Sequence, residues 1–271
     1  MSSSVSATGS AAGAESALEK QAYGKVFWRL VPFLMLCYVV AYLDRVNVGF
    51  AKLQMAQDLG FSETVFGLGA GIFFLGYFLF EVPSNLLLEK FGAKKTIMRI
   101  TIGWGAICML MAWVQTPTQF YILRFLMGAF EAGLQPGVIL YLTYWLPAHR
   151  RGKALAFFVS ASALSLMLGS PIAAYVMSAM NGLGGYTGWQ WLFIVQGAPA
   201  AILGVLVFIM LVDKPAQAGW LSKDEKALVD DAFAHDVKDV EGEAEGTFLH
   251  ALKDPKIYIL ALIYALLLGA T

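Results

Sequence analysis

Six long apolar runs constrain this chain more than any other feature of its sequence. Each run is long enough to cross a bilayer as a helix, which takes roughly 20 residues. They cover about 27–51, 64–88, 97–115, 119–146, 154–180 and 189–212. Apolar residues make up 58% of the chain, which is more than the core of a soluble protein of this size can bury. The sequence therefore predicts an all-α membrane protein built on a six-helix transmembrane bundle.

The remaining segments predict how the chain is divided. A tail of Ser, Ala and Gly opens it, and it lacks the basic start and apolar centre of a signal peptide. Ser222 and Glu225 have capping-box spacing and predict an amphipathic helix over 222–233 in a charged linker. We therefore expect a disordered cytoplasmic tail, a six-helix transmembrane domain, a cytoplasmic linker and the truncated start of a seventh helix, at 1–25, 26–213, 214–256 and 257–271.

Six helices followed by a long linker and a new span are typical of one half of a transporter made of two six-helix halves. The chain is thus expected to be an N-terminal half, which lacks a C-terminal six-helix partner. Basic residues predict its orientation, because cytoplasmic loops carry most of them. Only Lys52 lies on one set of connections, whereas the other set holds Lys20, Lys25, Arg29, Lys90, Lys94, Lys95, Arg99, Arg150, Arg151, Lys153 and Lys214. We expect a multi-pass protein of the cell (inner) membrane with a cytoplasmic N-terminus.

Charge and cysteine usage argue against several other classes. Lys plus Arg and Asp plus Glu both number 19, so no basic field favours nucleic acid as a partner. Cys37 and Cys108 lie far apart inside apolar runs, which argues against a metal cluster or a disulfide framework. The spans hold no nucleophile and histidine set, and the chain has no P-loop. We expect neither an enzyme nor a bound cofactor or metal.

Five ionisable residues fall inside the predicted spans: Asp44, Arg45, Glu81, Arg124 and Glu131. Each charge costs at least about 2.5–3.5 kcal/mol at the centre of a membrane helix, so a functional role is the first hypothesis. A structural ion pair that fixes helix positions is the alternative.

Arg45 shares one helical stripe with Tyr42 and Tyr38. A planar guanidinium beside two phenols is suited to binding a carboxylate. The neighbouring Asp44 points about 100° away on the same helix, so it faces an adjoining helix. Asp44 and Arg124 have similar predicted depth, which makes an ion pair between them plausible.

Glu131 shares a face with Arg124, deeper in the membrane, with Gly128 between them. The three histidines all lie outside the spans, so a proton carried by a side chain of this half must travel on a carboxylate. Glu131 is the first candidate and Asp44 the second, because burial and a nearby arginine act on a carboxyl group in opposite directions. Glu81 is expected to serve a structural hydrogen bond.

Four stretches carry a resemblance to a known family. They are 42–51 (YLDRVNVGFA), 85–95 (NLLLEKFGAKK), 123–137 (LRFLMGAFEAGLQPG) and a late group made of 189–194 (WQWLFI), 213–215 (DKP) and 220–222 (WLS). In this order they resemble the major facilitator superfamily, and specifically its anion:cation symporter family. Members of that family carry tartrate, galactonate, phthalate or hydroxyphenylacetate.

The resemblance implies a role for individual residues. Arg45 and Tyr42 would hold the substrate carboxylate, and Tyr77 and Ser162 would line the same cavity, alongside Tyr38 of the stripe. Asp44 and Glu131 would couple the proton, with Arg124 as the partner of Asp44. A cytoplasmic gating network would comprise Glu89, Lys90, Gly92, Lys94, Lys95 and Arg151, with Glu89 where the family usually has Asp.

The combined prediction is proton-coupled symport of a small organic anion, a hydroxy or sugar acid, by alternating access. Span 5 lacks the full glycine-rich antiporter pattern of the superfamily, which favours symport. Two alternatives remain open at this point: a non-transporting organic-acid sensor of the same fold, and an inactive fragment.

Overall fold

The computed structural model describes residues 17–243, 255–256 and 259, and within them every regular element is a helix. The α-helices are α1 (Ala17–Leu59), α2 (Glu63–Phe91), α3 (Ala93–Leu110), α4 (Pro117–Glu131), α5 (Leu134–Thr143), α6 (Ala148–Val159), α7 (Ala161–Ala179), α8 (Gly188–Met210) and α9 (Lys223–Glu243). Short 3-10 turns occur at η1 (Met111–Trp113), η2 (Leu183–Gly185) and η3 (Pro215–Gln217).

In the described part of the chain, 6 helical segments are long and apolar enough to cross a membrane. Their bounds are Ala17–Leu59, Glu63–Phe91, Ala93–Trp113, Pro117–Thr143, Ala148–Ala179 and Gly188–Met210. The prediction of an all-α membrane protein with six spans is confirmed. The predicted seventh helix, 257–271, lies outside the described residues except for Ile259.

The beginning of α1 differs from the predicted tail boundary at residue 25. The helix already includes Ala17, the first residue described, and Ala22 and Tyr23 are buried and extend its packed face beyond the predicted boundary. Residues 1–16 of the predicted tail lie outside the described range.

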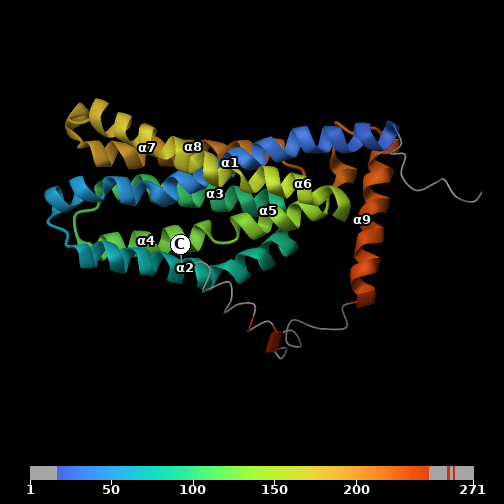
Figure 1. The fold of residues 1–271 in the computed structure, drawn as a ribbon, viewed down its shortest axis with the longest axis horizontal. Coiled ribbons are helices and arrows are strands. Elements are labelled where there is room, and N and C mark those ends of the chain that lie inside the picture. Colours follow the sequence, from blue (N-terminus) through green and yellow to red (C-terminus); the bar gives the residue numbers. More distant parts are fainter. Residues whose placement is uncertain (1–16, 244–254, 257–258, 260–271) are drawn as a thin grey trace, which may run out of the picture.

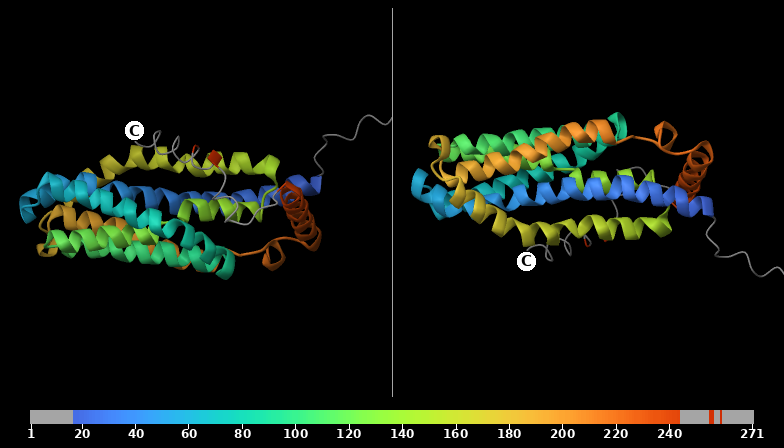
Figure 2. Two further views of the ribbon diagram at one scale, coloured as in Figure 1. Left: turned by 90° about the horizontal axis from the view of Figure 1, so that it is seen from below. Right: turned by 90° about the horizontal axis from the view of Figure 1, so that it is seen from above.

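The six spans run side by side along one long axis (Figures 1 and 2). Helix α3 packs along α8, α2 packs along α4, and α1 lies against α7 and α8. Helix α9 crosses the end of the bundle at which α1 begins, roughly perpendicular to the spans in Figure 1. The long axis is thus the direction in which the chain would cross a membrane.

Glycines allow α2 and α4 to approach at the level of their backbones. A β-carbon on Gly76 of α2 would collide with the carbonyl oxygen of Phe125, and one on Gly128 of α4 would collide with the carbonyl oxygen of Phe73. Small residues at such contacts drive helix association in membranes through close packing. These two glycines therefore set the distance between α2 and α4.

The fourth span is interrupted, although its sequence predicts one continuous apolar run over 119–146. Helix α4 ends at Glu131, and Gly133 adopts φ +87° before α5 begins. A β-carbon at Gly133 would also meet the side chain of Ser84 at 2.5–2.6 Å, so both the backbone conformation and the space favour glycine. The break places Glu131 at the last turn of a helix inside the bundle.

Helix α9 is held against the N-terminal part of α1. The predicted capping box is formed, since the Glu225 amide donates to Ser222 Oγ at 3.2 Å and the Ser222 amide donates to Glu225 Oε2 at 2.8 Å. The same carboxylate, 1% exposed, accepts from Lys25 Nζ at 2.7 Å. Just before α9, Trp220 stacks on Trp145 with ring centres 5.5 Å apart.

A matched pair of substitutions on α2 tests the glycine contact. We expect Gly76→Ala to lower stability by about 1–3 kcal/mol, because the added methyl group overpacks a backbone contact. The apparent Tm in detergent should fall by roughly 2–4 °C for each kcal/mol lost. Gly71→Ala is the control, since a β-carbon there meets nothing within 4 Å. An equal effect of both substitutions would contradict the packing role of Gly76.

The contact of α9 with α1 should depend on pH. Its hydrogen bond from Lys25 lowers the pKa of Glu225 below the ordinary value of about 4.3. The contact therefore contributes fully above that value and is lost as the pH falls through the lowered pKa. Hydrogen exchange of the α9 amides, corrected for intrinsic rates, should accelerate below about pH 4. Glu225→Gln should exchange fast throughout, and a pH step retained in that variant would assign the effect to another group.

Candidate functional site

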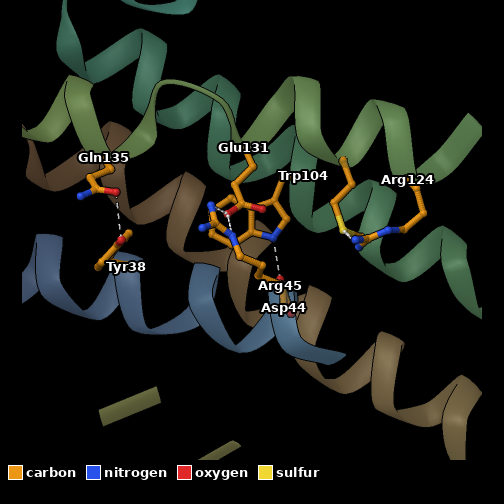
Figure 3. Close-up of polar contacts among 8 residues, drawn as sticks. Tyr38, Asp44, Arg45, Trp104, Arg124, Glu131 and Gln135 are labelled. Atoms are coloured by element: carbon orange, nitrogen blue, oxygen red, sulfur yellow. Dashed lines mark hydrogen bonds and ion pairs between the residues drawn. The ribbon is translucent and has the colours of Figure 1, made fainter. Parts of the chain in front are cut away.

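An ion pair between α1 and α4 lies at the centre of the site. Arg45 Nε and Nη2 donate to Glu131 Oε1 at 2.9 and 2.5 Å (Figure 3). The Glu131 side chain is 3% exposed and that of Arg45 is 26% exposed. The carboxylate is thus enclosed by protein while the guanidinium reaches open space. The residue pair joins the predicted anion-binding arginine directly to the predicted proton carrier.

Aromatic rings surround the guanidinium of Arg45. Its central carbon lies 5.6 Å from the ring centre of Tyr42, 5.8 Å from that of Phe73 and 5.3 Å from that of Tyr77. Ring faces attract a cation at these distances and hold the planar group in place. Tyr42 and Tyr77 therefore lie beside Arg45, and so does Phe73, which was not singled out by the sequence.

The second oxygen of Glu131 has an unusual environment. Glu131 Oε2 is buried and has no hydrogen-bond partner in the described part of the chain. The carboxylate also lies at the C-terminal end of α4, where the helix dipole disfavours negative charge. An orphaned buried oxygen costs free energy when the group is ionised, and protonation turns that oxygen into a donor.

Asp44 is fully buried and is held by neutral donors. Trp104 Nε1 of α3 donates to Asp44 Oδ2 at 2.6 Å, and Asn47 Nδ2 donates to Oδ1 at 3.2 Å (Figure 3). Asp44 therefore faces an adjoining helix, as its position on α1 predicted. The partner is a tryptophan, however, and no ion pair joins Asp44 to Arg124 in this structure.

Arg124 lies against α2 instead. Its Nε donates to the carbonyl oxygen of Gly69 at 3.3 Å, and its guanidinium carbon lies 4.5 Å from the ring centre of Phe73. Arg45 contacts the same ring, so Phe73 is a neighbour of both arginines. The expected pairing of Asp44 with Arg124 fails because each residue points to a different neighbouring helix.

Tyr38 and Ser162 occupy different positions relative to the site. Tyr38 Oη donates to Gln135 Oε1 at 3.1 Å (Figure 3). Gln135 is the second residue of α5, directly after the break in the fourth span. The ring of Tyr38 also packs edge to face with Tyr42, so Tyr38 joins the cluster. Ser162 donates to the carbonyl oxygen of Val159 at 2.9 Å within its own segment, and none of its hydrogen bonds reaches Arg45.

A cavity of about 480 Å³ connects the two arginines to the end of the bundle at which α1 turns into α2. Arg45, Lys52 and Arg124 are its charged lining residues, and its remaining lining is apolar or glycine. Lys52 also pairs with Glu63 near the end of the cavity. The volume falls in the range of small-molecule sites, and the excess of cationic groups suits an anion.

Five of the six predicted gating residues, all except Arg151 of α6, flank the turn between α2 and α3. Gly92 has φ +90°, and a β-carbon there would meet the carboxylate of Asp213 at 2.7–2.8 Å. Asp213 Oδ1 accepts from the backbone amide of Lys94 at 2.8 Å, which caps the start of α3. Asp213, from the end of α8, is thus the acid that contacts this turn.

The other members of the predicted gating network make separate contacts. Glu89 lines a cavity of about 470 Å³ beside Gly92 and α9. Lys94 Nζ lies over the ring of Phe208, Lys90 Nζ over that of Phe91, and Arg151 Nη2 donates to the carbonyl oxygen of Leu146. Lys95 lies on the first turn of α3. Among these contacts, that of Lys94 joins the turn to α8, and no ion pair of Glu89 with a basic residue is found in the described part of the chain.

The sequence profile described as Major Facilitator Superfamily matches residues 34–271. The chain belongs to the major facilitator superfamily. It is 53% identical over 250 residues to a protein of Agrobacterium vitis named as a tartrate transporter, and the match covers 92% of this chain and 57% of that protein. The metabolite transport protein NicT of Pseudomonas putida is 48% identical over 253 residues, which cover 93% of this chain and 57% of NicT.

Solved structures show the same fold. The inward open conformation of the xylose transporter XylE from E. coli superposes with a TM-score of 0.64 at 16% identity, over 82% of this chain and 57% of XylE. The superfamily and the six-helix bundle predicted from the sequence are therefore confirmed. The chain spans little more than half the length of the curated relatives that it matches.

Three contributors were missed by sequence reasoning: Phe73, Trp104 and Gln135. Each is an ordinary residue of an apolar span, and only its neighbours in space give it a polar partner. Gln135 offered a signal, because a polar amide in a membrane helix needs a hydrogen-bond partner. Trp104 and Phe73 offered none, since aromatic residues are common in such helices.

Removal of the indole donor tests how Asp44 is held. We expect Trp104→Phe to lower the free energy of unfolding by about 1–3 kcal/mol, because Asp44 Oδ2 loses its partner inside the bundle. Apparent Tm in detergent measures the loss. Trp113→Phe is the matched control, because Trp113 is 50% exposed. Equal Tm values for the two variants would mean that the Trp104 hydrogen bond contributes nothing net.

Proposed function

We propose that this chain is the N-terminal half of a proton-coupled symporter that moves a small organic anion by alternating access. The observation that carries the proposal is the pair of Arg45 and Glu131, in which the arginine borders a cavity and the acid is buried behind it. Ionisable groups inside a membrane bundle are expensive and typically belong to substrate or ion pathways. Membership of a transporter superfamily supports the same conclusion.

The proposed cycle follows from competition for one guanidinium. With Glu131 ionised, its Oε1 accepts both hydrogen bonds from Arg45. Protonation removes the negative charge from the acid, so Arg45 can turn its planar fork to a substrate carboxylate. Protonated Glu131 is then neutral, and the positive charge of Arg45 is balanced by the negative charge of the substrate carboxylate. A neutral, fully paired site is less costly to enclose in a dry interior.

Glu131 is the proposed proton carrier, and Asp44 is the second. The buried Oε2 of Glu131 has no partner among the described residues, so it is the atom on which a proton would reside. Asp44 is already stabilised by Trp104 and Asn47 and lies out of contact with the guanidinium of Arg124. Protonation of Asp44 would break no ion pair, whereas protonation of Glu131 would weaken its pair with Arg45, so an accessory role is proposed for Asp44.

The proposed substrate is a hydroxylated organic acid. The phenols of Tyr42 and Tyr77 flank Arg45, and phenol hydroxyls can donate to and accept from hydroxyl groups of a ligand. The relative from Agrobacterium vitis is named as a tartrate transporter at 53% identity, which supports this class. Lys52 and Arg124 line the same cavity and would add to the attraction for anions.

The proposal extends to topology and to the second half. Basic residues gather at the end of the bundle where α1 begins, so we place this end in the cytoplasm and the chain in the cell (inner) membrane. Relatives about 1.6 times as long as this chain support a second six-helix half, which would close the cavity from the other side. Alternating access by rocking requires both halves.

The test is uptake of labelled organic acids by proteoliposomes. The 271-residue chain would be compared with a version that continues through a second six-helix half, with and without an inward proton gradient. We expect accumulation only with the extended protein and the gradient. Transport by the short chain alone would show that copies of this half assemble into a carrier. Binding of an acid without any flux would favour the sensor alternative.

In the extended protein, Glu131→Gln should abolish accumulation driven by the proton gradient, while exchange of labelled for unlabelled substrate persists. The neutral amide imitates the protonated acid and cannot release a proton. Arg45→Ala should remove saturable uptake under both conditions. Asp231→Asn, an exposed position on α9, removes one negative charge far from the site and should transport normally. Gradient-driven accumulation by Glu131→Gln would overturn the assignment of the carrier.

A further inference from the structure

A third cavity, unrelated to the Arg45 site, lies at the end of the bundle where α1 begins. It has a volume of about 540 Å³ and is formed by the first turns of α1 and by α6. The two helices pack against each other there, as both views in Figure 2 show. We call it the α1–α6 groove, and its lining comprises Lys20, Tyr23, Gly24, Phe27, Trp28, Leu146, His149, Arg150, Lys153 and Phe157.

The groove carries positive charge. Lys20, Arg150 and Lys153 line it, and no acid does. Glu19, next to the groove, accepts from Arg150 Nη2 at 3.4 Å and offsets part of that charge. Neither Lys20 nor Lys153 forms an ion pair with any residue that the structure describes, and both are exposed. Two cationic groups are therefore available to a ligand.

Polar and apolar groups are ordered along the groove. Lys20 lies toward the start of α1, and Trp28 lies further along the helix by about 12 Å, at 1.5 Å per residue. Trp28 is 72% exposed, and Phe157 of α6 lies at the same apolar end with its ring near that of Phe27. The basic residue Lys20 thus lies nearer the end of the bundle, and the exposed rings of Trp28 and Phe157 lie nearer its membrane-spanning part.

This order matches a phospholipid molecule. Tryptophan is enriched at the boundary between bilayer and water, which places the groove at headgroup depth. Basic pockets between transmembrane helices at the cytoplasmic side bind the headgroups of anionic lipids. A soluble anion would contact only the cationic end of the groove and would make no use of Trp28 and Phe157. Acyl chains, by contrast, cover both.

We propose that the α1–α6 groove binds an anionic phospholipid, with the phosphodiester between Lys20, Arg150 and Lys153 and the acyl chains along Trp28 and Phe157. The inference is independent of the proposed transport activity, because none of these residues contacts Arg45 or Glu131. A bound lipid would join the beginning of α1 to α6, and so would fasten the first and fifth spans at one end of the bundle.

Native mass spectrometry of the purified 271-residue chain in detergent tests the groove. Cardiolipin, phosphatidylglycerol and phosphatidylcholine would be titrated separately. We expect the two anionic lipids to bind at least about tenfold more tightly than phosphatidylcholine. The double variant Lys20→Gln and Lys153→Gln should weaken anionic lipid binding by roughly thirtyfold, since each basic residue near an anionic surface contributes about fivefold.

The double variant Lys223→Gln and Lys226→Gln on α9 is the matched control, because it removes the same charge at the same end of the bundle outside the groove. It should bind anionic lipid as the unaltered chain does. Equal weakening by both double variants would overturn the proposal and assign binding to general charge. Equal affinity for phosphatidylcholine, or displacement of the lipid by millimolar inorganic phosphate, would overturn it as well.

Discussion

The ion pair of Arg45 and Glu131 is the interaction on which the arrangement of this bundle depends. Two charges taken out of water are tolerated only when they are paired, and loss of one partner from a buried pair typically costs about 3–5 kcal/mol. The contact joins α1 to the last turn of α4, so these helices cannot shift independently while both groups are charged. A change of protonation at Glu131 is therefore also a change in how two helices are held.

Backbone features bring that pair together. Gly76 and Gly128 allow α2 and α4 to approach closely, and Gly133 ends α4 where Glu131 can turn toward α1. The ring of Phe73 contacts the guanidinium groups of both Arg45 and Arg124, so two like charges share one aromatic neighbour. The site thus rests on glycine contacts and one aromatic residue as much as on its charged groups.

The end of the bundle where α1 begins is organised separately. Asp213 caps α3 beside Gly92, and Lys25 holds α9 through Glu225. The α1–α6 groove lies at the same end. These contacts join the first, third, fifth and sixth spans without using any residue of the Arg45 site. Substitutions at one region can therefore be interpreted without reference to the other.

The sequence by itself determined the number of spans, the charged residues inside them and the resemblance to a superfamily. Each of these depends only on residues that are close together in the sequence, such as the length of an apolar run or a short motif. The sequence also placed Tyr42 and Arg45 on one face, since the helical period determines which residues of one helix share a side. Only the tertiary structure decided the partners across helices. The period of a helix does not determine the rotation or depth of its neighbours, which follow from glycine contacts and from the break at Gly133. For this reason Glu131 was found against Arg45, and Asp44 was found against Trp104 and not against Arg124.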